Sequence, residues 1–432
     1  MALAVLLMPL GKGHVMVKPL WDLIAENRGG AAVAIPSVCS AQADVITASL
    51  IRARTLDRMI VVEATSNQVN QDGGYTGMTP RDFVGCVHRL ARDAGVDRDR
   101  IIFGGDHLGP QAWRKHNAEL AMAKAHELVH SYVDAGFQKI HLDCSEGCAG
   151  EAAQLDDDLT AVRSETLART CFEAMSDPSG LLFVVGTEVP PPGGGREDEQ
   201  SDIAATTPAA ARTTIEAHGA VFGDLARLIG GLVVQPGVEF SATTVHHLPM
   251  TRDPKLIDAL GDWPNVCLEA HSTDYQRAPA FVRLAQLGFA FQKVGPALTY
   301  AYREALYGLD KVRTLGALGQ GNLPEVMEHV MTQDPRHWIN HYHGDPKTLK
   351  TLRHTGLADR IRYYWPDPSA RNAVAQLKDD LAKGVPDKIL SQVFAADVLD
   401  RAAMLEGPLA QRLIDAHIQL ALDPYFFDRV LT

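Results

Sequence analysis

A carboxylate and an imidazole stand side by side where an apolar segment of the chain ends. Residues 101–105 are typical of a buried strand, and Asp106 and His107 follow them directly. In a parallel α/β protein, side chains at the carboxyl end of a strand reach the ligand crevice at that edge of the sheet. An adjacent Asp and His can divide the chemistry there, since one can move a proton while the other holds a metal ion. The alternative is a capping aspartate beside a structural histidine.

The same pattern recurs along the chain. Seven of eight predicted strands end in polar groups that a buried core would not tolerate without partners. These groups are Glu63 with Asn67 and Gln68; Asp106 and His107; His141 and Asp143; Glu188; Gln235 and Glu239; Glu269, His271 and Asp274; and Lys293. A single carboxylate of this kind is usually a helix cap or a hydrogen-bonded structural group. The repetition indicates instead that these side chains share one site.

The elements that must position these groups follow a regular order. Short apolar runs alternate with longer amphipathic segments from about residue 31 to 315, as in repeated β-α units. The predicted strands are residues 33–37, 59–64, 101–105, 139–143, 181–188, 232–236, 265–270 and 290–294. Eight such units predict an α/β fold, a (β/α)8 TIM barrel over residues 17–315, with a doubly wound open sheet as the alternative. The remaining residues, 316–432, predict a helical C-terminal extension.

Composition excludes several classes of protein. The chain has 432 residues, of which 46% are hydrophobic, so it can bury a sizeable core. Its formal net charge of −12 argues against nucleic-acid binding, and its six cysteines are too sparse for a disulfide scaffold. The apolar residues 3–10 are fewer than the roughly 20 that span a bilayer, so we expect a cytoplasmic protein without a membrane partner. The aromatic residues of the extension favour a homo-oligomer.

The motifs at the strand ends also resemble those of a known family, the Z subunits of tagatose-bisphosphate aldolases (GatZ/KbaZ-like). They are EATSNQV at 63–69, GGYTGMTP at 73–80, GGDHLGP at 104–110, KIHLDCS at 139–145, GTEVP at 186–190, QPGVEF at 235–240, EAHSTDYQ at 269–276, KVGPAL at 293–298, YHGD at 342–345 and RYYWPD at 362–367. The resemblance runs from about residue 17 to the end. It implies a TIM barrel related to the class II, metal-dependent aldolases.

Two functions are implied by this resemblance. Members are described as D-tagatose 6-phosphate 4-epimerases, or as non-catalytic partners that stabilise a class II aldolase subunit. We expect the metal-dependent epimerase, acting on a phosphorylated ketose by retro-aldol and aldol steps, with the stabilising subunit as the alternative. Some members carry the label of tagatose 6-phosphate kinase, but the chain has no Gly-x4-Gly-Lys-Ser/Thr loop for phosphates.

Analogy with class II aldolases assigns roles to individual residues. The expected ligands of a divalent metal, Zn²⁺ or alternatively Mn²⁺, are His107, Glu188 and His271, with Glu239 as the alternative to Glu188. The expected catalytic groups are Asp106, Asp143 and Glu239, where Asp143 alternatively orients His107. The expected substrate-binding residues are Asn67, Gln68, Ser272, Thr273, Lys293 and Gly295, with phosphate near the loops after strands seven and eight. Lys293 is alternatively a buried lysine paired with Glu269.

One departure from the family pattern affects the sixth strand. Some relatives have Asp-His after the Val-Glu-Phe stretch, whereas here Ser241 and Ala242 follow Phe240. No metal-ligating histidine is therefore expected there, which leaves Glu239 or Gln235 to represent that strand.

Overall fold

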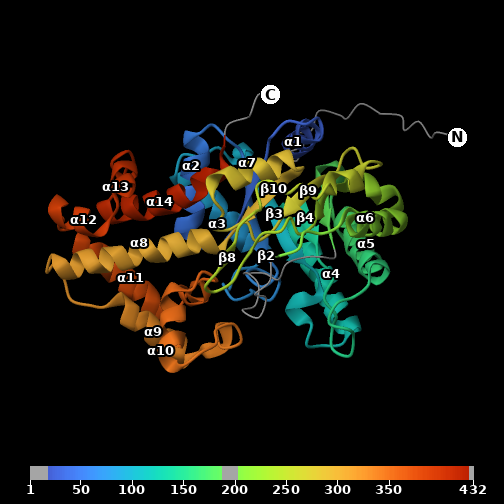
Figure 1. The fold of residues 1–432 in the computed structure, drawn as a ribbon. Coiled ribbons are helices and arrows are strands. Elements are labelled where there is room, and N and C mark those ends of the chain that lie inside the picture. The colour runs from blue at the N-terminus through green and yellow to red at the C-terminus, as the bar shows by residue number, and fades with distance from the viewer. Residues whose placement is uncertain (1–17, 187–202, 428–432) are drawn as a thin grey trace.

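The eight predicted strands close into a barrel. Residues 18–186 and 203–427 are described in this structure, a computed structural model (Figure 1). The parallel strands are β1 (Ile35–Cys39), β2 (Ile60–Thr65), β3 (Ile101–Leu108), β4 (Lys139–Leu142), β5 (Leu182–Val185), β6 (Ile229–Val233), β9 (Cys267–Ala270) and β10 (Phe289–Val294). Their order, β1-β10-β9-β6-β5-β4-β3-β2, is that of a closed barrel. The (β/α)8 prediction is confirmed, and the open-sheet alternative is wrong.

Helices alternate with these strands, and several of them begin at residues whose side chains cap the helix. They are α2 (Ala43–Thr55), α3 (Pro80–Asp93), α4 (Ala118–Ala135), α5 (Asp157–Ala174), α6 (Pro208–Phe222), α7 (Ala278–Gln286) and α8 (Pro296–Leu315). Thr79 and Asp82 form a capping box at the start of α3. Asn117 and Asp156 accept backbone N–H groups at the starts of α4 and α5. These caps provide acceptors for N–H groups that have no partner within the helix.

Helix α1 (Lys18–Arg28) closes the amino-terminal end of the barrel. Its buried residues Leu20 and Ile24 belong to one apolar cluster with residues near the beginnings of the strands, among them Val61, Ile102 and Phe291. An apolar plug at this end leaves the carboxyl ends of the strands as the open end, where (β/α)8 barrels place their active sites.

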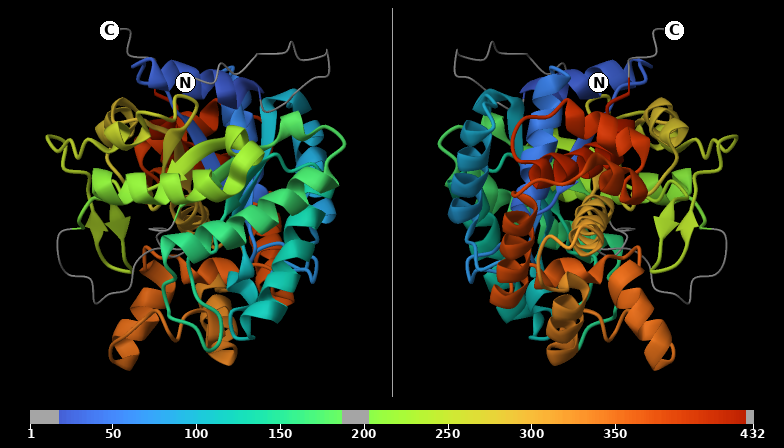
Figure 2. Two further views of the ribbon diagram at one scale, coloured as in Figure 1. Left: turned by 90° about the vertical axis from the view of Figure 1, so that its right-hand side faces the viewer. Right: turned by 90° about the vertical axis from the view of Figure 1, so that its left-hand side faces the viewer.

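The chain after α8 is helical, as predicted. Its helices are α9 (Leu323–Gln333), α10 (Pro346–Thr355), α11 (Pro368–Leu381), α12 (Asp387–Val393), α13 (Ala396–Ala403) and α14 (Leu409–Leu422), with a short 3-10 helix η7 (Arg360–Tyr364). Helix α14 packs against α2 and α8. After it, Tyr425 returns to the barrel, where its hydroxyl donates to the carbonyl of Thr273 at 3.1 Å. Figure 2 shows α9 and α10, in orange, at the end of the molecule opposite to α1, in blue.

One small element was not predicted. Strands β7 (Glu239–Phe240) and β8 (Val245–His246) form an antiparallel hairpin between β6 and β9. Gly237 precedes it with a φ of 96°, a left-handed conformation that glycine adopts without strain. Glu239 therefore lies on this hairpin and not at the end of the sixth barrel strand.

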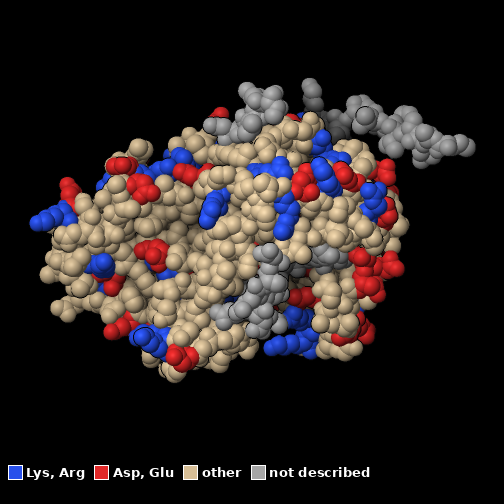
Figure 3. Space-filling view, viewed as in Figure 1, with Lys and Arg blue, Asp and Glu red and all other residues tan. Residues whose placement is uncertain are grey.

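The distribution of surface charge and the lengths of the helices bear on the sequence-based expectations. Acidic and basic residues are interspersed over the face drawn in Figure 3. Among the described residues, no helix combines the length and the apolar character that crossing a bilayer requires.

Candidate active site

A layer of charged side chains fills the barrel beneath its open end. The Nζ atom of Lys139 on β4 lies 2.8 Å from Glu63 Oε1 and 2.5 Å from Glu269 Oε2. The Nζ atom of Lys293 on β10 lies 2.9 Å from Glu63 Oε2 and 3.3 Å from Glu269 Oε1. The alternative prediction for Lys293, a buried lysine paired with Glu269, is therefore confirmed. Gly104 leaves room for this layer, because a Cβ there would approach the Glu63 side chain to 2.7 Å. All four charged side chains are buried, and their pairing offsets the cost of desolvation.

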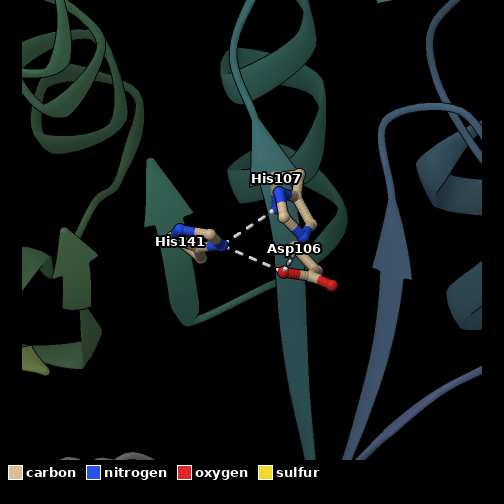
Figure 4. A group of neighbouring side chains, drawn as sticks. All are labelled: Asp106, His107 and His141. Atoms are coloured by element: carbon tan, nitrogen blue, oxygen red, sulfur yellow. Dashed lines mark hydrogen bonds and ion pairs between the residues drawn. The ribbon is translucent and has the colours of Figure 1, made fainter. Parts of the chain in front are cut away.

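Asp106 and His107 both face His141, although they are consecutive residues of β3 (Figure 4). Asp106 Oδ1 lies 2.9 Å from His141 Nδ1, and the ring centroids of His107 and His141 are 5.0 Å apart. Consecutive side chains of a regular strand point to opposite faces. Here His107 has a φ of 48°, and the pairing of β3 with β4 shifts register at this point. Backbone strain of this kind costs about 1 to 3 kcal/mol and is concentrated at functional sites.

Three imidazoles converge at this end of the barrel. The ring centroid of His271, which follows β9, lies 5.1 Å from those of His107 and His141. Among the described residues, ligand-type atoms that lie within 4.8 Å of one another form three groups. One is Cys39 with Glu63 and Asp106, and the two that contain imidazoles are Asp106 with His107 and His141, and His141 with Glu269 and His271. His141 is common to both imidazole-containing groups. Its Nε2 is buried and has no hydrogen-bond partner among the described residues.

Each of these rings is held by a carboxylate on one nitrogen. Asp143 Oδ2 lies 2.7 Å from His107 Nδ1, and Glu269 Oε1 lies 2.9 Å from His271 Nε2. Asp143 in turn accepts a hydrogen bond of 2.7 Å from the Ser145 hydroxyl. A ring N–H donated to a carboxylate leaves the other nitrogen with its lone pair, which is the usual arrangement of metal-ligating histidines. The donor set therefore fits a divalent metal cation.

The charges around this site set the protonation of its members. Burial alone would raise the pKa of Asp106, but the charges of His107 and Lys293 and the hydrogen bond from His141 hold it well below its usual range. Burial lowers the pKa of His271 to about 3, and the charge of Lys293 acts in the same direction. At neutral pH, Asp106 is therefore an ionised carboxylate, the state that a proton acceptor must have, and His271 is a neutral imidazole, the state that binds a metal ion.

A cavity of about 430 Å³ opens onto these groups. This volume lies within the range of small-molecule sites. Eight of the residues predicted from the sequence line it: Asn67, Gln68, Asp106, His107, His271, Ser272, Lys293 and Gly295. The backbone of Ser272 is left-handed, with a φ of 53°, as at His107.

The other predicted residues lie elsewhere. Asp143 is hydrogen-bonded to Nδ1 of His107. The hydroxyl of Thr273 donates a hydrogen bond of 2.5 Å to the carbonyl of Lys293. The Glu239 carboxylate accepts a hydrogen bond of 2.9 Å from the backbone N–H of Phe240. Asp143, Thr273 and Glu239 are not among the described residues that line the cavity. Glu188 lies outside the described residues.

Two groups of site residues were missed by the sequence analysis. His141 was noted as a polar residue of its strand, but the predicted set of metal ligands did not include it. The sequence feature that could have identified it is its two-residue spacing from Lys139, which places both side chains on one face of β4. Arg362, Arg371 and Lys378 line the cavity from the C-terminal extension.

Comparison with known proteins places the chain in a family. Residues 20–428 match the model of a family described as D-tagatose-1,6-bisphosphate aldolase subunit GatZ/KbaZ-like. The chain belongs to this GatZ/KbaZ-like family. The resemblance inferred from the motifs at the strand ends is thereby confirmed.

Individual relatives of this GatZ/KbaZ-like protein match it over nearly their whole length. A protein of Agrobacterium fabrum (strain C58 / ATCC 33970), named D-tagatose 6-phosphate 4-epimerase, is 45% identical over 95% of this chain and 98% of its own. The crystal structure of a probable tagatose 6 phosphate kinase from Sinorhizobium meliloti 1021 superposes with a TM-score of 0.82 at 40% identity, over 91% of this chain and 99% of that chain. A putative fructose-1,6-biphosphate aldolase from Coccidioides immitis is more distant, with a TM-score of 0.45 at 15% identity, over 83% of this chain and 98% of that chain.

Proposed function

We propose that this GatZ/KbaZ-like protein is a metal-dependent ketose-phosphate 4-epimerase that interconverts D-tagatose 6-phosphate and D-fructose 6-phosphate. The observation that carries the proposal is the convergence of an ionised carboxylate, Asp106, with the imidazoles of His107, His141 and His271 at one cavity. The 45% identity to a protein named D-tagatose 6-phosphate 4-epimerase supports the choice of substrate.

The chemistry of a 4-epimerase explains why these groups are needed. The hydrogen on C4 of a 2-ketose is not α to the carbonyl, so its removal would leave a carbanion without resonance stabilisation. Cleavage of the C3–C4 bond avoids this problem. Asp106 accepts the proton of the C4 hydroxyl, and the O–H electrons form the C4 carbonyl. The C3–C4 electron pair becomes a C2–C3 double bond, while the π electrons of the C2 carbonyl move to its oxygen and give an enediolate. After the aldehyde rotates, the same electron pair attacks its other face, and Asp106 returns the proton to the C4 oxygen.

His107, His141 and His271 would hold the divalent cation, with Zn²⁺ or Mn²⁺ matching an imidazole-rich site. When bound, this cation supplies positive charge beside the oxygens on which negative charge develops during cleavage. The buried Nε2 of His141, which has no hydrogen-bond partner among the described residues, supports this assignment. Glu188 stays a prediction as a further ligand.

Other residues position these groups and the sugar. Asp143 orients the His107 ring through a hydrogen bond of 2.7 Å. Lys293 pairs with Asp106 and keeps its carboxylate ionised. Asn67, Gln68 and Ser272 line the cavity with amide and hydroxyl groups, which suit the hydroxyl groups of a sugar. A kinase is not proposed, because the sequence has no Gly-x4-Gly-Lys-Ser/Thr loop.

An activity assay of the purified protein tests the proposal. Loaded with Zn²⁺ or Mn²⁺, the protein alone should convert D-tagatose 6-phosphate into D-fructose 6-phosphate, and Asp106→Asn should keep the metal but lose turnover. Absence of turnover by the metal-loaded protein would contradict the proposal. If activity required an added class II aldolase subunit, the alternative of a stabilising partner would be favoured, as the description of the family suggests. Cleavage of tagatose 1,6-bisphosphate by the protein alone would indicate an independent aldolase.

A further inference from the structure

The C-terminal extension contributes positive charge to the cavity that the barrel opens. Arg362 belongs to η7, and Arg371 and Lys378 belong to α11, yet all three line the same cavity as Asp106, His107 and His271. A charged ligand in this cavity would therefore contact both the barrel and the extension.

Two of the basic residues that line the cavity have no carboxylate within ion-pair distance in the part of the chain that the structure describes. Lys293 is paired with Glu63, Glu269 and Asp106, and Lys378 lies 3.4 Å from Asp44 Oδ1. By contrast, neither Arg362 nor Arg371 has a carboxylate within 4.0 Å among the described residues. The positive charge of these two guanidinium groups is thus available to an anionic ligand.

Arg362 is fixed in place by neutral acceptors. It donates hydrogen bonds to the carbonyls of Ala358 and Asp359, the latter at 3.0 Å, and to the hydroxyl of Tyr363 at 3.0 Å. Its guanidinium also packs 4.5 Å from the centroid of the Tyr363 ring. The charges of Asp359 and Asp274 also act on this guanidinium, although neither carboxylate forms an ion pair with it among the described residues. The contacts of Arg362 hold its guanidinium in place, so little side-chain entropy remains to be lost when an anion binds.

The position at which barrels often bind phosphate is already occupied by protein groups. At the start of α8, the backbone N–H groups of Gly295 and Ala297 both donate to Asp274 Oδ1, at 3.0 Å and 2.8 Å. The hydroxyl of Thr273 is bonded to the Lys293 carbonyl, and the ammonium of Lys293 is held by carboxylates. A phosphate at this helix start would have to displace a carboxylate, and the carboxylate would repel it.

We propose that Arg362 and Arg371 form the phosphate subsite of this protein and bind the phosphomonoester of the ketose substrate, a proposal that rests on the proposed function. Guanidinium groups recognise phosphate through paired, charge-assisted hydrogen bonds. In this arrangement the barrel carries out the chemistry while the helical extension selects phosphorylated sugars. The extension is therefore part of the substrate site.

Binding of inorganic phosphate, measured by calorimetry, tests the subsite without turnover. The metal-loaded protein should bind phosphate, and Arg371→Gln should weaken this binding by about tenfold or more, because one charge-assisted contact is removed. Arg371 is exposed on α11, so this variant is expected to fold. Lys388→Gln, which removes one charge from the exposed surface of α12 away from the cavity, should bind phosphate like the unmodified protein.

Kinetics with two substrates provide the second measurement. Arg371→Gln and Arg362→Gln should each raise KM for D-tagatose 6-phosphate by about tenfold or more and lower kcat/KM for unphosphorylated D-tagatose by a much smaller factor. An active protein whose arginine variants bind phosphate and D-tagatose 6-phosphate normally would overturn the subsite. Phosphate binding that depends on Arg371 in a protein without epimerase activity would overturn the proposed reaction but support the subsite.

Discussion

Asp143 and His107 form a buried hydrogen-bonded pair, with 2.7 Å between Asp143 Oδ2 and His107 Nδ1. Although burial opposes the shift, the charge of Asp106 and the hydrogen bond and charge of Asp143 raise the pKa of His107. Because the carboxylate of Asp143 holds the Nδ1 proton, Nε2 is the nitrogen that carries the lone pair when this ring is neutral, as metal binding requires. The aspartate was expected either to transfer protons or to orient His107. Its hydrogen bonds to His107 and Ser145, and its place outside the lining of the cavity, favour the second role.

Replacement of Asp143 should weaken metal binding more than it changes the fold. In Asp143→Asn the carboxylate charge that holds the His107 tautomer is lost, so we expect about 10- to 100-fold lower affinity for Zn²⁺, measured by competition with a chelator. Ser145→Ala serves as a control, because it removes one donor to Asp143 but leaves the bond to His107 intact. Equal Zn²⁺ affinity of Asp143→Asn and the unmodified protein would argue against the orienting role.

His141→Asn tests whether the histidine shared by both ligand groups holds metal. An asparagine amide can still donate to Asp106, but it has no equivalent of the imidazole Nε2. We expect the variant to lose bound metal, measured by elemental analysis after desalting, while circular dichroism stays unchanged. His130→Asn, on the exposed face of α4, should retain metal. A fully metallated His141→Asn variant would remove His141 from the ligand set.

The strand ends were predictable because polar residues after apolar runs are a local pattern. Asp106 and His107 could be placed at one edge of the sheet from their position alone, and so could His271. The role of His141 could not, because whether its ring meets those of His107 and His271 depends on how the barrel closes. Arg362 and Arg371 belong to the C-terminal extension, whose aromatic residues favoured a homo-oligomer, and only the return of the extension to the barrel brings them to the cavity.

The buried charged layer should contribute to stability through its balance of charges. Lys139→Met removes a cation that lies between Glu63 and Glu269, so two buried carboxylates lose a partner. We expect the free energy of unfolding to fall by about 3 to 5 kcal/mol, measured by urea denaturation. Adding Glu63→Gln to this variant should restore part of the loss, because one of those charges is then removed. If the double variant were as unstable as Lys139→Met alone, loss of packing would be the better explanation.

Asp274 should make stability depend on pH in the acid range. Burial raises the pKa of its carboxyl to about 6, although the N–H groups of Ala297 and Gly295 oppose the shift. The usual value for an unfolded chain is about 3.9, so the folded state binds this proton more tightly. Its stabilising contribution is complete below about pH 4 and is lost as the pH rises through about 6, a change of about 3 kcal/mol.

Asp274→Asn should remove this dependence, because the amide oxygen can accept the same two backbone hydrogen bonds but does not ionise. Relative to the unmodified protein, the variant should therefore gain stability as the pH is raised from about 4 to about 7, measured by urea denaturation at a series of pH values. Asp387→Asn, on the exposed surface of α12, is the matched control and should follow the unmodified protein at each pH. Parallel stability curves for Asp274→Asn and the unmodified protein would show that the Asp274 carboxyl titrates alike in the folded and unfolded states, despite its burial at the start of α8.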